Sequence, residues 1–234
     1  MEGQVQDARR VRYLVDFSVD GDIRYLAHND MVRMFSKACA RAELPLSFSE
    51  GFNPRVRLTL PFPRPVGQRS DAERLQLDLS HQFDTGELVD RLNEQMPSGV
   101  RAFAAISADP SQPCRPCSVT YEVDVTGLDA NASDPTPLAQ RIESFLSSPV
   151  IDFSRVRHRD GRVKTVDIRP FVDGLSVVEN SIRMSILVTQ SDGGLTTPAE
   201  VCQALGMDAD VINHRVRRVK ILWFSNPKKQ KATP

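Results

Sequence analysis

The sequence predicts an α+β fold made of two tandem lobes. In the first hundred residues, strand-like alternation and helical periodicity follow one another in the order strand, helix, strand, strand, helix, strand. The second half roughly repeats this order, with an extra hairpin. This is the ferredoxin-like, or split βαβ, order, in which an antiparallel sheet carries its helices on one face. We expect a disordered N-terminus at residues 1–9, a first lobe at 10–108, a linker at 109–118, a second lobe at 119–224 and a basic disordered tail at 225–234.

The first lobe opens with a strand, because every second residue from Val11 to Val19 is apolar and would lie on one buried face. A helix follows at residues 29–44. Asn29 can accept a backbone N–H at its start, and Leu44-Pro45 ends it because proline disfavours a helical residue before it. The remaining elements of this lobe are strands at residues 55–60, 73–80 and 99–107 and a helix at 84–96 that Asp84 caps.

The second lobe follows a connector that is rich in proline and serine. Asp160-Gly161 is a strong turn signal and closes a hairpin between residues 150–158 and 162–169. Pro198 opens a short helix and Gly206 ends it. The other expected elements are strands at residues 119–125, 175–179, 182–189 and 214–224, a helix at 136–146 and a turn at Asn180-Ser181.

The charge of the chain is balanced, with 30 basic and 30 acidic residues, so only local clusters can indicate a partner. Basic residues gather between 155 and 169, and no acid occurs from residue 211 onward. If these segments meet, they form a patch that binds phosphate backbones by counterion release. The alternative is two solvated hairpin faces and a disordered tail. No apolar run approaches the roughly 20 residues that span a bilayer, and a cytoplasmic protein is expected.

His28 stands where a strand gives way to a helix. A histidine at this place can contact a phosphate or shuttle a proton, because its usual pKa is close to neutrality. It can also form a structural hydrogen bond across the turn. The structural role is favoured, since no second acid–base group is identifiable nearby in the sequence.

The stretch "SEGFNPRVRL" carries more than a turn requires. Gly51 can supply a backbone angle that other residues avoid, and Asn53-Pro54 sets a turn. Arg55 and Arg57 would then lie on one face of the following strand, where they could grip phosphate. Phe52 is either a stacking platform for a base or a core residue. A solvated strand face behind a structured loop is the alternative.

Two further motifs leave their roles open. Asp167 and Arg169 flank Ile168 and would pair at the end of a strand, or Arg169 would bind an anion. Cys114 and Cys117 form a single Cys-x-x-Cys, which is half of a zinc site, a redox pair or an accident of the connector. The sequence contains no phosphate-binding loop, dinucleotide fingerprint, nucleophile elbow or iron–sulfur cysteine triplet.

The segments "YLAHNDMVRMFSKACARAELPLSFSEGFNPRVRLTLPFPRPVG", "VDIRP" and "HRVRRVKIL" resemble the radical-SAM-linked protein family over about residues 10 to 224. The resemblance implies a bacterial domain of unknown function that stands beside a radical SAM gene or is fused to the C-terminus of a radical SAM protein. It implies no reaction. The positions that match the family pattern are His28, Asp30, Arg33, Glu50, Gly51, Asn53, Pro54, Asp167, Arg169 and Pro170.

We therefore expect a non-catalytic accessory protein of a radical SAM enzyme that binds tRNA or ribosomal RNA. The resemblance implies that the iron–sulfur cluster and S-adenosylmethionine sit on the partner, and no cofactor or metal is expected on this chain. Alternatives are a metal-independent endoribonuclease with His28 as general base, or a purely protein-binding module. The expected binding residues are His28, Arg33, Glu50, Gly51, Asn53, Arg55, Arg57, Arg157, Arg159, Arg169 and Arg217.

Overall fold

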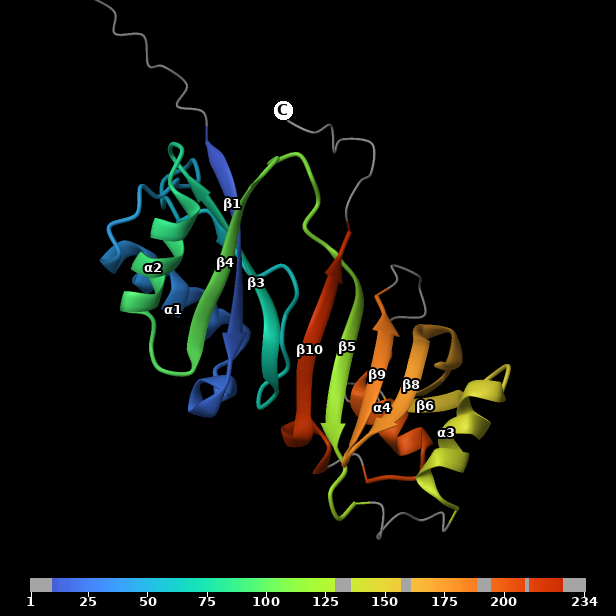
Figure 1. Ribbon diagram of the computed structural model, residues 1–234. Helices are drawn as coiled ribbons and strands as arrows, with labels where there is room; N and C mark the ends of the chain where they lie inside the picture. Colours follow the sequence, from blue (N-terminus) through green and yellow to red (C-terminus); the bar gives the residue numbers. More distant parts are fainter. Residues whose placement is uncertain (1–9, 129–135, 157–160, 189–194, 209–210, 225–234) are drawn as a thin grey trace, which may run out of the picture. The chain divides into compact units, whose positions relative to one another are not determined.

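A computed structural model describes residues 10–128, 136–156, 161–188, 195–208 and 211–224 of the chain. The predicted disordered ends at 1–9 and 225–234 lie outside the described residues. The fold is α+β, and the described residues contain four α-helices and mostly antiparallel strands (Figure 1). The chain divides into two compact units. Unit 1 holds Met1–Arg115 and Trp223–Pro234, and unit 2 holds Pro116–Leu222.

Unit 1 contains a sheet in which β4, β1 and β3 lie in that order, with β2 also paired to β3. All of these pairings are antiparallel. The elements are β1 (Val11–Val19), a 3-10 turn (Gly21–Tyr25), α1 (His28–Arg41), β2 (Leu58–Thr59), β3 (Arg69–Leu79), α2 (Thr85–Gln95) and β4 (Val100–Ala108).

The core of unit 1 confirms the alternation read from the first strand. Tyr13, Val15, Phe17 and Val19 are all buried, and they pack with α1, α2 and the leucines of β3. Phe17 meets Phe35 of α1 edge to face, with 4.7 Å between ring centroids. Both helices therefore cover the same face of the sheet, and the opposite face of β1 carries Leu14 together with the polar Arg12, Asp16 and Ser18.

Two boundaries in unit 1 differ from the expectation. The helix α1 begins at His28, with Ala27 as its N-cap, so Asn29 is not the cap. The carbonyl of Ala27 accepts hydrogen bonds from the backbone N–H groups of Asp30 and Met31 at 3.0 Å each, which starts the helix earlier. The strand expected at 55–60 shrinks to Leu58–Thr59, because the residues before it fold back into a hairpin.

Unit 2 has the strand order β10-β5-β9-β8, with β6 and β7 forming a separate antiparallel pair. Its turn between β8 and β9 is at Glu179-Asn180, one residue earlier than expected, and Glu179 has a positive φ of 53°. The elements are β5 (Pro116–Asp124), α3 (Leu138–Ser147), β6 (Asp152–Val156), β7 (Val163–Asp167), a 3-10 turn (Arg169–Phe171), β8 (Val172–Val178), β9 (Ser181–Leu187), α4 (Pro198–Ala204), a 3-10 turn (Asn213–Arg215) and β10 (Val216–Trp223).

The start of α4 agrees with the role predicted for Pro198. Thr197 accepts a hydrogen bond from the backbone N–H of Glu200, whose carboxylate accepts one from the backbone N–H of Thr197. Each side chain thus satisfies a backbone donor that has no partner within the helix. Among the described residues, no helix combines the length and the apolar character needed to cross a membrane.

Candidate functional site

Residues 47–57 of unit 1 form a small hairpin, called here the 47–57 hairpin. Phe48 and Val56 pair across it, and the backbone N–H of Ser49 donates to the carbonyl of Arg55 at 2.8 Å. Two backbone hydrogen bonds fasten its base to β3. The carbonyl of Asp78 accepts from the N–H of Ser47, and the N–H of Asp78 donates to the carbonyl of Arg57, both at 3.0 Å. The tip is therefore presented on an ordered stem.

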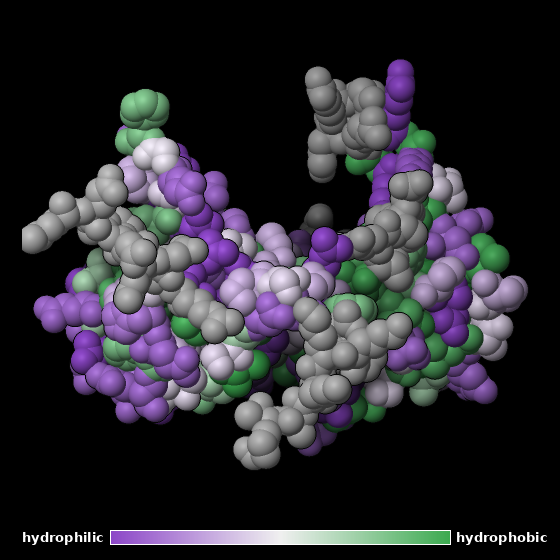
Figure 2. Space-filling model, turned by 90° about the horizontal axis from the view of Figure 1, so that it is seen from above, coloured by the Kyte–Doolittle hydropathy of each residue, from purple (hydrophilic) through white to green (hydrophobic). Residues whose placement is uncertain are grey.

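The tip of this hairpin exposes an aromatic ring. Phe52 is fully exposed, more so than any other large hydrophobic residue that the structure describes. Gly51 has a φ of +116°, an angle that side-chain-bearing residues rarely adopt, so the glycine allows the bend before Phe52. Glu50, Asn53 and Arg55 are exposed as well. Figure 2 shows that hydrophobic and hydrophilic residues are mixed on the face seen from above.

The two arginines of the hairpin have different roles. The Nε of Arg57 donates to the carbonyl of Phe48 at 3.0 Å, so this side chain braces the stem. Arg55 receives only a backbone anchor, since its N–H donates to the hydroxyl of Ser49 at 3.0 Å, and the residue is exposed. The expectation that both lie on one face of a following strand is wrong, because both precede β2. Arg55 is the cation at the tip.

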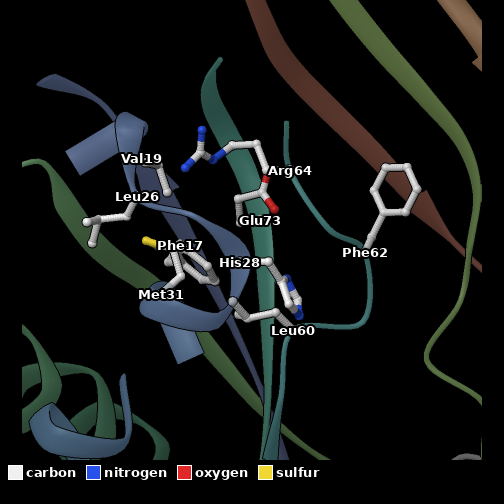
Figure 3. A pocket seen from close by; sticks show the side chains of 9 residues that line it. All are labelled: Phe17, Val19, Leu26, His28, Met31, Leu60, Phe62, Arg64 and Glu73. Carbon is white, nitrogen blue, oxygen red and sulfur yellow. The ribbon is translucent and has the colours of Figure 1, made fainter. Parts of the chain in front are cut away.

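His28 lies in a different part of unit 1. As the first residue of α1 it is half-buried, and it lines a small pocket of about 20 Å³. Figure 3 shows that the walls come from β1, α1, β3 and the segment after β2. Glu73, only 6% exposed, contributes a carboxylate from the core-facing side of β3, opposite Phe17 in the strand register. No residue of the 47–57 hairpin lines this pocket.

The predicted pair of Asp167 and Arg169 does not form between side chains. The Asp167 carboxylate accepts hydrogen bonds from the backbone N–H groups of Ile151 at 2.9 Å and of Arg169 at 3.0 Å. The guanidinium of Arg169 donates to the carbonyls of Leu146, at 2.9 Å and 3.3 Å, and of Val172, at 2.8 Å. The structure thus uses Arg169 to join the end of α3 to the start of β8.

The other predicted cations are distributed over both units. Arg33 is exposed and pairs with Asp30 at 3.1 Å, one turn away on α1, and Arg217 is exposed on β10. Arg157 and Arg159 lie outside the described residues. Arg155, from the same basic segment, is clamped by Glu200 at 2.7 Å and 2.9 Å. Internal pairing therefore reduces the cationic character expected of residues 155–169.

All four cysteines are free. Burial raises the pKa of the Cys39 and Cys202 thiols to about 12, which fits their predicted place in the core. Cys117 is exposed at the start of β5 and donates to the carbonyl of Leu222, whereas Cys114 is half-buried. Within the described ranges, no three histidine, cysteine or acidic side chains gather as a metal site would require.

The family model described as an uncharacterized protein conserved in bacteria, DUF2344, matches residues 12–198. The chain belongs to this family. The match in this DUF2344 protein begins in β1 and ends at the first residue of α4, so it includes both His28 and the 47–57 hairpin. No curated protein matches the sequence.

Proposed function

We propose that this DUF2344 protein is a non-catalytic accessory protein of a radical SAM enzyme and that it binds RNA, either tRNA or ribosomal RNA, through the 47–57 hairpin. The observation that carries the proposal is the full exposure of Phe52 at the tip, with the exposed Arg55 close behind it. Unpaired RNA bases stack on aromatic side chains, and arginine neutralises the phosphates beside them. In unit 2, Arg155 is bound by Glu200 and Arg169 by the carbonyl of Val172. We therefore favour the hairpin over these two arginines as the RNA contact.

The stem supports a binding role. Its hydrogen bonds include the Ser49–Arg55 backbone bond, the Arg57–Phe48 bond and the two backbone bonds to Asp78. A tip that is already ordered loses little conformational entropy when it binds a ligand. An exposed phenylalanine on an ordered stem is therefore suited to stacking.

The link to a radical SAM enzyme rests on the sequence resemblance, which is most specific between His28 and Pro54. The cluster and S-adenosylmethionine would belong to the partner, and this chain would hold the RNA. We also infer that both units are ferredoxin-like lobes. The orders β4-β1-β3 and β10-β5-β9-β8, with helices inserted after the first strand and before the last, support that inference.

Binding of a fluorescently labelled single-stranded RNA, followed by anisotropy, tests the proposal. Phe52→Ala should weaken binding about 5- to 150-fold, since one stacked base is worth about 1–3 kcal/mol. Arg55→Ala should weaken it and reduce its dependence on salt. Phe103→Ala is the matched control, because Phe103 is an exposed phenylalanine of unit 1 on β4. Equal affinity of Phe52→Ala and the wild-type protein would exclude the hairpin as the RNA contact.

One observation favours the endoribonuclease alternative. The buried carboxylate of Glu73 lines the same pocket as His28, so a second acid–base group stands there that the sequence did not reveal. This alternative predicts cleavage of RNA in the presence of a chelator and its loss in His28→Ala. RNA that stays intact at high protein concentration excludes it. A purely protein-binding module instead predicts no salt-dependent RNA complex at all.

A further inference from the structure

Unit 1 has a second hollow, called here the Trp223 hollow, of about 90 Å³ and open to solvent. It lies on the face of the sheet opposite the helices, where Arg12 of β1 and Arg74 of β3 point away from the core. Its other walls come from the segment after β4 and from the end of β10 (Val216–Trp223) with Phe224. The side chains that matter are Arg12, Arg74, Gln112, Cys114, Trp223 and Phe224.

The two arginines of the hollow are held rigidly. Arg74 binds Asp16 with two hydrogen bonds of 2.6 Å and 2.9 Å, and Arg12 binds Asp78 with two of 2.8 Å and 3.3 Å. Arg12 also donates to the carbonyl of Pro110 at 2.7 Å. Both guanidinium planes are thus fixed before any ligand arrives. The Asp78 carboxylate also pairs with Arg10 at 3.3 Å, and Asp109 adds a further carboxylate to the wall of the hollow.

The aromatic wall adjoins this pair. The guanidinium of Arg74 lies over the ring of Trp223, 4.7 Å from its centroid. Phe224 follows, half-exposed, and its backbone N–H donates to the carbonyl of Arg115 at 2.7 Å. Burial raises the pKa of the Cys114 thiol, although Arg74 partly opposes this, so the thiol is neutral at pH 7. Planar groups therefore line a hollow with little free charge.

We infer that the Trp223 hollow binds a nucleobase of the RNA. Aromatic rings and arginine planes both stack on bases, whatever the base, and the amide of Gln112 offers a donor and an acceptor for a base edge. Because Asp16, Asp78 and Asp109 offset the charge of the three arginines, which are Arg10, Arg12 and Arg74, a flat uncharged ring suits the hollow better than a phosphate. The inference rests on the proposed function, and it adds a base-binding site distinct from the 47–57 hairpin.

The chain has a single tryptophan, so tryptophan fluorescence reports on this hollow directly. The full chain is titrated with a single-stranded RNA, with the same ribose–phosphate backbone lacking bases, with adenosine and with inorganic phosphate. The RNA and adenosine should each give a saturable change in fluorescence, and the two controls without bases should give none. Phe224→Ala and Gln112→Ala should weaken the adenosine response several-fold, whereas Phe52→Ala should leave it unchanged.

The outcomes separate the inference from the proposed function. RNA that binds by anisotropy without altering Trp223 fluorescence overturns the base-binding hollow but not the RNA-binding hairpin. Adenosine that alters the fluorescence while no RNA binds overturns the proposed function but not the hollow. An equal response to the baseless backbone or to phosphate also overturns the inference, because the hollow would then recognise phosphate.

Discussion

The side-chain amide of Asn93, on α2, pairs with both backbone groups of Ala102 on β4. Its Nδ2 donates to the Ala102 carbonyl and its Oδ1 accepts from the Ala102 N–H, each at 2.9 Å. β4 lies at the end of the strand order, so no further strand within the described residues reaches it. The amide thus takes the place of a neighbouring strand and protects a sheet edge at which other chains could pair.

Asn93→Ala should lower the free energy of unfolding by about 1–3 kcal/mol, because it removes the partner of both the N–H and the carbonyl of the buried Ala102. Urea unfolding followed by circular dichroism measures the loss. Glu94→Ala, at the exposed neighbouring position of α2, is the control and should change stability by less than about 0.5 kcal/mol. Similar values for the two variants would contradict this role of Asn93.

Gly51 and Gly99, two of the positive-φ glycines of unit 1, should respond differently to substitution. At Gly51 a Cβ meets nothing within 4 Å, so Gly51→Ala costs only backbone strain, about 1 kcal/mol. At Gly99 a Cβ would lie 2.5 Å from the carbonyl oxygen of Asp20, whose N–H bonds to the Gly99 carbonyl. Gly99→Ala should therefore cost at least about 1 kcal/mol more in urea unfolding. An equal cost would mean that the Asp20 turn moves aside freely.

The Arg74–Asp16 pair should couple strongly. Arg74 is largely buried and donates two hydrogen bonds to Asp16, so a double-mutant cycle with Arg74→Ala and Asp16→Ala should give about 1–3 kcal/mol. The exposed Arg91–Glu87 pair of α2 is the comparison, with an expected coupling of about 0.3–0.5 kcal/mol. Arg74→Ala should also alter Trp223 fluorescence, because the guanidinium over the indole is removed.

Stability should fall at alkaline pH through the buried thiols. Their ordinary pKa is 9.0, and burial raises the pKa of Cys39 and Cys202 to about 12. The unfolded chain therefore loses these protons first. The contribution of the two thiols to the free energy of unfolding is fully present below pH 9. It decreases as the pH rises from 9 toward 12, by about 1.4 kcal/mol per pH unit for each thiol.

Urea unfolding at pH 8 and pH 10 measures this effect. Cys39→Ala and Cys202→Ala should each show a smaller loss between the two pH values than the wild-type protein. The difference isolates the thiols from tyrosines and lysines, which titrate in the same range. An unchanged pH dependence in both variants would show that the thiols ionise in the folded state as readily as in the unfolded one.

The amino-acid pattern alone determined the buried faces of the elements. The alternation of β1 identified Tyr13, Val15 and Phe17 as core, and Asp84 was correctly assigned as the cap of α2. These features depend on periods of two and 3.6 residues or on a neighbour three positions away, so they are visible in a short window.

Only the tertiary structure decided what each charged side chain binds. Arg12 meets Asp78, which is 66 residues away, through the register of β1 with β3, and Arg169 reaches the carbonyl of Leu146 rather than Asp167. The place of Trp223 beside Arg74 likewise joins two residues of unit 1 that are far apart in the sequence. Such contacts depend on strand register and on backbone groups that every residue carries, and neither leaves a local mark in the order of side chains.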